Sequence, residues 1–198
     1  GKLSGYTWNL VQDYPLRLSV GEIHPGRICS TTFTCAGQFT SEAAEPRPFK
    51  GVAVETPRFT VRAVQLDHGI PSLAFALEER FHINVLSARL QGKGYAIGPW
   101  LNELKELIWQ GRPDDCRVVV PSFDKQGGKI EAALGDLKRE IVTITAGQKI
   151  AYVADCSYRT ENVEKIVGLA RAADILFCEA AFFERDSEKA RARQHLTA

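Results

Sequence analysis

The last third of the chain carries a regular succession of an apolar segment, an amphipathic segment and a second apolar segment. Residues 149–154 form a short apolar run that predicts a buried strand, and residues 174–180 form another. Between them, apolar residues recur at helical spacing after Thr160, which we expect to cap the helix. The order strand, helix, strand predicts a right-handed parallel unit, whose functional residues lie at the carboxyl ends of its strands. This pattern restricts the fold class to α/β or α+β.

The first two-thirds of the chain is β-rich. Three segments alternate apolar and polar residues: 16–20, 52–55 and 59–64. A period of two is typical of a strand with one buried face. Residues 73–77 predict a more fully buried strand, the spacing over 84–90 and 99–109 predicts helices, and 125–129 predict a flexible loop.

Composition restricts the class of protein and its compartment. The 198 residues carry a formal net charge of +1, so overall charge gives no sign of nucleic-acid binding. No apolar stretch approaches the roughly 20 residues of a membrane span, and the start lacks the apolar core of a signal peptide. The five cysteines are odd in number and contain no Cys-x-x-Cys pair, which argues against a disulfide framework and a thiolate zinc site. We therefore expect free thiols in a cytoplasmic protein.

Two residues are candidate metal ligands. Asp155 directly follows the apolar run 149–154, where a carboxylate can bridge two divalent metals. His68 lies between Asp67 and Gly69, just after an alternating segment, and imidazole is a common zinc ligand. Each has a structural alternative, because Asp155 can cap the next loop and His68 can be an ordinary residue at a strand end. Taken singly, each structural alternative is the more common.

Glu179 and His195 form a second candidate pair. A carboxylate can orient an imidazole that then protonates a leaving group. The alternative is a strand-end Glu179 paired with Arg185 or Arg191, which leaves His195 as a solvated residue.

An ordered set of segments connects these candidates. The set consists of VQLDHGIPS at 64–72, IGPW at 97–100, YVADC at 152–156, ADILFCEAAF at 173–182 and QHLTA at 194–198. This succession resembles the ribonuclease Z family, the transfer-RNA 3′-processing endonucleases of the metallo-β-lactamase superfamily. The resemblance runs from about Val64 to the last residue and is thin upstream of that point.

The resemblance implies a four-layer αβ/βα sandwich with a dinuclear zinc site at one edge. It implies that His68 ligates one zinc ion and that Asp155 bridges both. His195 would match the proton donor to the leaving oxygen, and Glu179 the carboxylate that supports it. The implied partner is RNA, with precursor transfer RNA as the substrate, and a homodimer is one expected assembly.

Some features of the family are missing. The His-x-His-x-Asp-His motif and the family's last histidine ligand do not occur, and no long Gly/Pro-rich substrate arm is evident. Cys156 stands where the family usually has Thr, and Cys178 where it often has His. We therefore expect residues 1–198 to be a single, incomplete metallo-β-lactamase-fold domain without its N-terminal metal motif and C-terminal end. Such a fragment should bind zinc weakly and be inactive alone.

Two alternatives to a precursor-transfer-RNA endonuclease stay open. The first is another metal-dependent phosphodiesterase or hydrolase of the superfamily, which the near-zero net charge and the missing arm favour. The second is a non-catalytic binding module that kept the fold and lost the site. The second alternative predicts that alanine at His68 or Asp155 leaves function intact.

Overall fold

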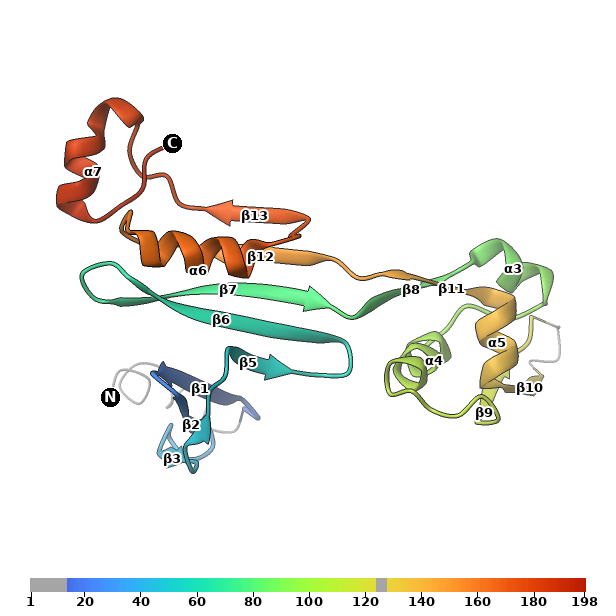
Figure 1. Cartoon of the computed structure of the whole chain (residues 1–198). Helices are drawn as coiled ribbons and strands as arrows, with labels where there is room; N and C mark the ends of the chain where they lie inside the picture. Colours follow the sequence, from blue (N-terminus) through green and yellow to red (C-terminus); the bar gives the residue numbers. More distant parts are fainter. Residues whose placement is uncertain (1–13, 124–127) are drawn as a thin grey trace. The chain divides into compact units, whose positions relative to one another are not determined.

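The computed structural model describes residues 14–123 and 128–198, and the chain divides into two compact units (Figure 1). The first unit ends at Ala53 and the second runs from Val54 to Ala198. Helices and several sheets are mixed, so the predicted α+β class is confirmed. The single, incomplete domain predicted over residues 1–198 stays a prediction.

The first unit is built on a small antiparallel sheet. Its strands are β1 (Arg17–His24), β2 (Arg27–Thr34), β3 (Ser41–Ala43) and β4 (Arg47–Pro48). β2 pairs with each of the other three. Gly26 makes the turn from β1 to β2 at φ +74°, a region that glycine enters without steric cost. The alternation over 16–20 correctly predicts a strand, although β1 is exposed along most of its length.

A five-stranded sheet positions the candidate site. Its order is β13-β12-β7-β6-β5. The strands are β5 (Val52–Glu55), β6 (Phe59–Asp67), β7 (Pro71–Glu79), β12 (Lys149–Val153) and β13 (Ile175–Cys178). β12 runs parallel to β13 and antiparallel to β7, which is also antiparallel to β6. β12, α6 (Thr160–Ala170) and β13 therefore form the predicted strand–helix–strand unit.

Helix α6 packs on this sheet and shares a buried core with β6, β7 and β12. Ala74 and Ala76 of β7 and Ala151 of β12 are fully buried, and their small side chains let the helix approach the strands closely. Leu169 closes the core from the helix side. Thr160 is the first residue of α6 rather than its cap, and no side chain caps the helix start. The predicted helix is therefore confirmed, and its predicted cap is wrong.

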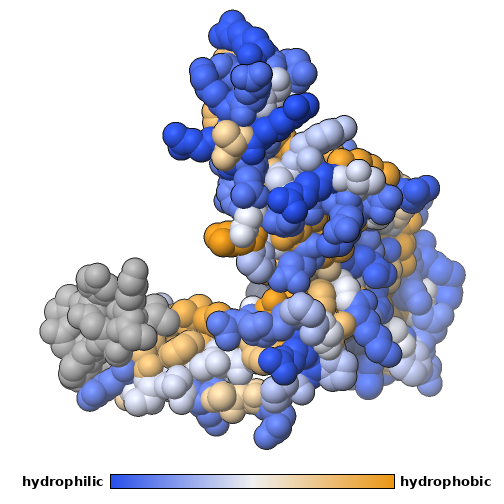
Figure 2. Space-filling model, turned by 60° about the vertical axis from the view of Figure 1, so that its left-hand side comes forward, coloured by the Kyte–Doolittle hydropathy of each residue, from blue (hydrophilic) through white to orange (hydrophobic). Residues whose placement is uncertain are grey.

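The prediction of a buried strand over 174–180 is wrong in its burial. β13 is a strand, but all four of its residues are exposed, with Phe177 at 54%. The physical reason is that β13 is an edge strand, which pairs in the five-stranded sheet with β12 alone. Tyr152 of the neighbouring β12 is exposed to the same degree. The molecule thus has apolar surface open to solvent, as the orange areas of Figure 2 illustrate.

Residues 81–146 form a lobe with a core of its own. β8 (Phe81–Val85) pairs with β11 (Val142–Ala146), and β9 (Arg117–Pro121) pairs with β10 (Lys129–Ala133). The helices are α3 (Ser87–Gly92), α4 (Trp100–Trp109) and α5 (Leu134–Ile141), at the far end of the β8–β11 ribbon in Figure 1. Leu104, Val120 and Leu137 are fully buried there, and this core shares no residue with the core under α6. The sequence patterns did not predict that the second unit has two separate hydrophobic cores.

The helix predictions differ in quality. The helix over 99–109 is confirmed as α4, whereas the one over 84–90 begins later because residues 81–85 are strand β8. Of the predicted loop 125–129, residues 125–127 lie outside the described residues. The last helix, α7 (Ser187–Arg193), follows the 3-10 turn η1 (Glu184–Asp186). Within the described ranges, no helix is long and apolar enough to cross a membrane.

Candidate metal centre

His68 lies in the tight connection between β6 and β7. Its N–H donates to the Ile70 carbonyl at 3.0 Å, and the Gly69 N–H donates to the Asp67 carboxylate at 2.7 Å. Gly69 adopts φ +76°, and a Cβ there would lie 2.4 Å from the Gln194 side-chain nitrogen. The left-handed backbone favours glycine here, and a Cβ would displace the end of the Gln194 side chain. Glycine lets the C-terminal segment approach His68 closely.

The hydrogen bond made by His68 sets its tautomer. His68 Nδ1 lies 2.8 Å from the main-chain oxygen of Gln194. A carbonyl oxygen only accepts, so Nδ1 of the neutral ring carries the proton and Nε2 keeps its lone pair. A bond of this kind to the second ring nitrogen is the usual support of a metal-ligating histidine. His68 therefore presents Nε2 as a donor atom.

Asp155 lies two residues beyond the end of β12. Its φ of +45° places it in the left-handed region, which Asp tolerates better than most residues. Asp155 is exposed, and no group in the described part of the chain makes a hydrogen bond or ion pair with its carboxylate. The alternative in which Asp155 caps the following loop is therefore not observed. The carboxylate remains available to a cation.

Glu179, directly after β13, links His195 to the segment that follows Asp155. One carboxylate oxygen accepts from His195 Nδ1 at 2.8 Å, and the other accepts the Cys156 N–H at 2.7 Å. The Glu179 side chain is 12% exposed. With both oxygens engaged in this way, Glu179 does not adopt the alternative pairing with an arginine. The predicted pair of Glu179 and His195 is thus in contact.

Three side chains from distant parts of the sequence converge here. A ring nitrogen of His68, a ring nitrogen of His195 and a carboxylate oxygen of Asp155 lie within 4.8 Å of one another. Two zinc bonds of about 2.1 Å hold their ligand atoms no more than about 4.2 Å apart, so a small inward movement places all three around one ion. Imidazole nitrogen and carboxylate oxygen are donors that suit zinc. The residues present therefore suit a divalent metal ion as a class of ligand.

A pocket of about 430 Å³ opens beside His195. Its other walls are Tyr158, Glu184, Ser187, Ala190, Arg191, Leu196 and Thr197. Glu184 accepts a hydrogen bond from the Thr197 hydroxyl at 2.8 Å. Within residues 14–123 and 128–198, no carboxylate pairs with the Arg191 guanidinium. That guanidinium is therefore free to meet an anionic group in the pocket.

Cys156 follows Asp155, and its N–H binds Glu179. Its thiol is not suited to act as a nucleophile or a metal ligand. Burial, with a smaller effect of the neighbouring Glu179, Cys178 and Asp155, raises the pKa of its thiol to about 11. The thiol stays protonated near neutral pH, and only the thiolate is a good nucleophile or metal ligand.

Sequence reasoning missed the groups that hold the site together. The main-chain oxygen of Gln194 leaves no trace in the sequence. Asn162 could have been found from the sequence, because it lies on the same helical face as Ile166 and Leu169, where apolar residues are expected. A polar residue on an apolar helix face is a signal of a buried hydrogen-bonding role.

Comparison with known proteins adds the family context. No family model matches the chain. A ribonuclease Z from Deinococcus radiodurans is 26% identical over 197 residues, which cover 99% of this chain and 55% of that protein. One from Thermobifida fusca is 28% identical over 193 residues, 90% of this chain and 52% of that protein. One from Geobacillus kaustophilus is 31% identical over 153 residues, 75% of this chain and 42% of that protein. The chain is ribonuclease Z-like.

The matches to the Deinococcus and Thermobifida proteins cover most of this ribonuclease Z-like chain. The chain itself spans only about half the length of those two relatives. The predicted resemblance is confirmed, and it extends further than the motifs suggest. The match to the Deinococcus radiodurans protein covers nearly the whole chain, including the segment upstream of Val64 where no motif is evident.

Proposed function

We propose that the chain supplies part of the active site of a zinc-dependent, ribonuclease Z-like endoribonuclease. Its substrates are phosphodiesters such as the 3′ trailer of precursor transfer RNA. The observation that carries the proposal is the convergence of His68, Asp155 and His195, in a chain similar to proteins named ribonuclease Z.

In this proposal His68, through Nε2, and the Asp155 carboxylate would hold the metal. Zinc, when bound, supplies positive charge to a phosphoryl oxygen and lowers the pKa of water. A dinuclear site takes more ligands than these, and the relatives are about twice as long. The remaining ligands are therefore proposed to come from elsewhere in the gene product.

His195 is proposed as the proton donor to the departing 3′ oxygen. Its Nδ1–H is held by the Glu179 carboxylate at 2.8 Å, so Nε2 is the nitrogen that takes up and releases a proton. The carboxylate also stabilises the imidazolium that exists before transfer, as in other carboxylate–histidine pairs. The pocket beside His195 offers Arg191 for a neighbouring phosphate.

A second role for His195, as a third metal ligand, is favoured by its place in the same cluster. The two roles exclude each other, since both use Nε2. Titration with Co²⁺ separates them by the visible spectrum. A proton donor predicts that His195→Ala keeps the cobalt spectrum and affinity but loses cleavage, whereas a ligand predicts that both change.

The four-layer αβ/βα sandwich is proposed as the architecture of the complete domain. The support is the apolar surface of β12 and β13, where Tyr152, Leu176 and Phe177 are at least half exposed. Burying such a surface against further layers of a sandwich releases about 25 cal/mol per Å². The cytoplasmic location and the homodimer are carried forward as predictions from the sequence.

A second candidate function keeps the site and changes the substrate to a phosphodiester other than transfer RNA. The net charge of +1 favours it, because long RNA substrates usually meet a basic surface. Parallel assays on precursor transfer RNA and on a small phosphodiester separate the two. Cleavage of the small substrate alone supports this second candidate.

The decisive experiment compares the gene product that contains these residues with its Asp155→Asn variant. We expect cleavage 3′ of the transfer-RNA body, dependent on added zinc, and a loss of at least two orders of magnitude in the variant. The 198 residues alone are expected to bind zinc weakly and to cleave nothing. Full activity of the Asp155 variant would contradict the proposal and favour a non-catalytic module.

A further inference from the structure

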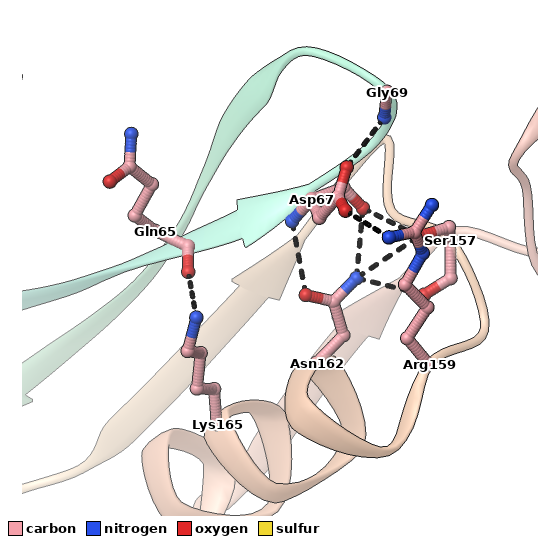
Figure 3. Close-up of polar contacts among 7 residues, drawn as sticks. All are labelled: Gln65, Asp67, Gly69, Ser157, Arg159, Asn162 and Lys165. Carbon is pink, nitrogen blue, oxygen red and sulfur yellow. Dashed lines mark hydrogen bonds and ion pairs between the residues drawn. The ribbon is translucent and has the colours of Figure 1, made fainter.

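Asn162 is an almost completely buried polar residue at the start of helix α6, with 2% of its surface exposed. Its carboxamide makes hydrogen bonds to Asp67 and to Ser157 (Figure 3). The side-chain oxygen accepts the Asp67 N–H at 3.0 Å. The side-chain nitrogen donates to the Asp67 carbonyl and to the Ser157 carbonyl, both at 2.8 Å.

These bonds join two segments that carry candidate ligands. Asp67 immediately precedes His68, and Ser157 lies two residues after Asp155. The Ser157 N–H and hydroxyl also donate to the Asp67 carbonyl, at 2.9 and 2.8 Å. The Asn162 side chain therefore binds both the main chain next to His68 and the main chain that follows Asp155.

An amide is the group that this position requires. It offers an acceptor and two donors at once, whereas a carboxylate only accepts and would face two carbonyl oxygens. Removing the amide leaves the Asp67 N–H and the Ser157 carbonyl without this partner, which costs stability and loosens the segments, while the Asp67 carbonyl keeps its two bonds from Ser157. The exposed ion pair of Arg159 with the Asp67 carboxylate, at 2.6 Å, cannot replace it, because it does not reach the main chain.

We propose that Asn162 is a positioning residue of the metal centre, which sets the separation of His68 and Asp155 through the main chain of Asp67 and Ser157. The inference rests on the proposed metal-binding function of these two residues. Such outer partners typically contribute 10- to 100-fold to metal affinity without touching the metal.

Lys165 provides a matched control. It lies one turn further along α6 and donates to the Gln65 carbonyl at 3.0 Å, so it also ties the helix to β6 (Figure 3). It does not contact the segments of His68 or Asp155 among its described hydrogen bonds. Lys165→Ala therefore tests whether loosening the contact between α6 and β6 is enough to alter the site, whereas positioning should be specific to Asn162.

The test uses the 198-residue chain and two readouts, each measured where the variant is folded by circular dichroism. The first is the set of nuclear Overhauser contacts between the His68 ring and the side chains of Asp155 and His195 without metal. The second is the Kd for Zn²⁺ from a titration followed by nuclear magnetic resonance. We expect Asn162→Ala to lose the His68–Asp155 contact and to weaken zinc by about 10- to 100-fold, with Lys165→Ala unchanged. Asn162→Ser, which keeps a small polar group, serves the same purpose if the alanine variant unfolds.

The outcomes are separable. A folded Asn162 variant that retains the wild-type contacts and Kd overturns the positioning role alone. Equal losses in the Asn162 and Lys165 variants also overturn it, because they indicate a general effect on the helix. Absence of saturable zinc binding by the wild-type chain overturns the metal centre, and the positioning role with it, whatever the contacts show.

Discussion

The imidazole rings of His68 and His195 lie 4.7 Å apart between centroids, tilted by 59°. The contact depends on the hydrogen bond from His68 Nδ1 to the main-chain oxygen of Gln194, the residue immediately before His195. The same carbonyl therefore sets the tautomer of one histidine and the position of the other. Gly69 lies beside this contact, and a side chain there would displace the end of the Gln194 side chain.

Replacement of His68 by Ala should abolish measurable zinc binding by the chain, because it removes one of the two proposed metal ligands. Zinc affinity is measured by competition with a chromophoric chelator. His82→Ala is the control, since His82 is exposed and pairs with Glu79 at 3.1 Å outside the cluster. Equal zinc affinity in both variants would remove His68 from the metal site.

Replacement of Glu179 by Gln should reverse the tautomer of His195. A carboxylate accepts from Nδ1–H, whereas a glutamine whose oxygen still accepts the Cys156 N–H turns its amide donor toward Nδ1. Nδ1 must then accept, and the proton moves to Nε2. Nitrogen-15 shifts of the imidazole report the tautomer directly.

Glu184→Gln is the control for this tautomer shift. Glu184 lines the same pocket but binds the Thr197 hydroxyl, so its replacement should leave the His195 tautomer unchanged. An unchanged tautomer in the Glu179 variant would contradict the assignment of the pair. In the active gene product, the Glu179 variant should also lose roughly 10²- to 10⁴-fold in cleavage, the usual contribution of acid–base catalysis.

Replacement of Gly69 by Ala should destabilise the chain by about 1–3 kcal/mol, since the new Cβ is strained at φ +76° and meets Gln194. Urea unfolding measures the change. Gly92→Ala is the control, because a Cβ at Gly92 meets nothing within 4 Å and its backbone is not left-handed. That control should be neutral or stabilising by roughly 0.4–1 kcal/mol. A neutral Gly69 variant would argue against the close approach of the C-terminal segment.

Stability should fall at alkaline pH through Cys156. Burial raises the pKa of this thiol from 9.0 to about 11, so the unfolded chain loses the proton first as pH rises. The contribution is fully present below pH 9.0 and is lost as pH rises toward about 11. Denaturant midpoints across this range should decline less steeply in Cys156→Ala. An identical slope in both proteins would show that the thiol does not couple to folding.

Strand ends were the most predictable part of the site. The apolar runs before Asp155 and Glu179 predict strands by composition and length alone, so the carboxylates fall at the carboxyl ends of β12 and β13. The strand β6 before His68 follows from its alternation in the same way. Local patterns suffice here because strand periodicity and apolar burial act over a few neighbouring residues.

Burial and element boundaries were less predictable. The apolar run over 174–180 predicts a buried strand, yet all four residues of β13 are exposed. Burial depends on what covers a strand rather than on the composition of the strand itself. Residues 84 and 85 fit a helical pattern, but they pair with β11 as strand β8. Such pairing is a long-range interaction that overrides local spacing.

The sequence by itself determined which chemical groups this protein carries and that strands end beside them. It also determined the α+β class and the ribonuclease Z likeness, through the order of its short segments. Only the tertiary structure decided that His68, Asp155 and His195 meet, that Glu179 holds His195, and that Asn162 joins the two ligand-bearing segments. The reason is physical: these contacts link residues far apart in the chain and depend on main-chain carbonyls and N–H groups, which every residue type supplies.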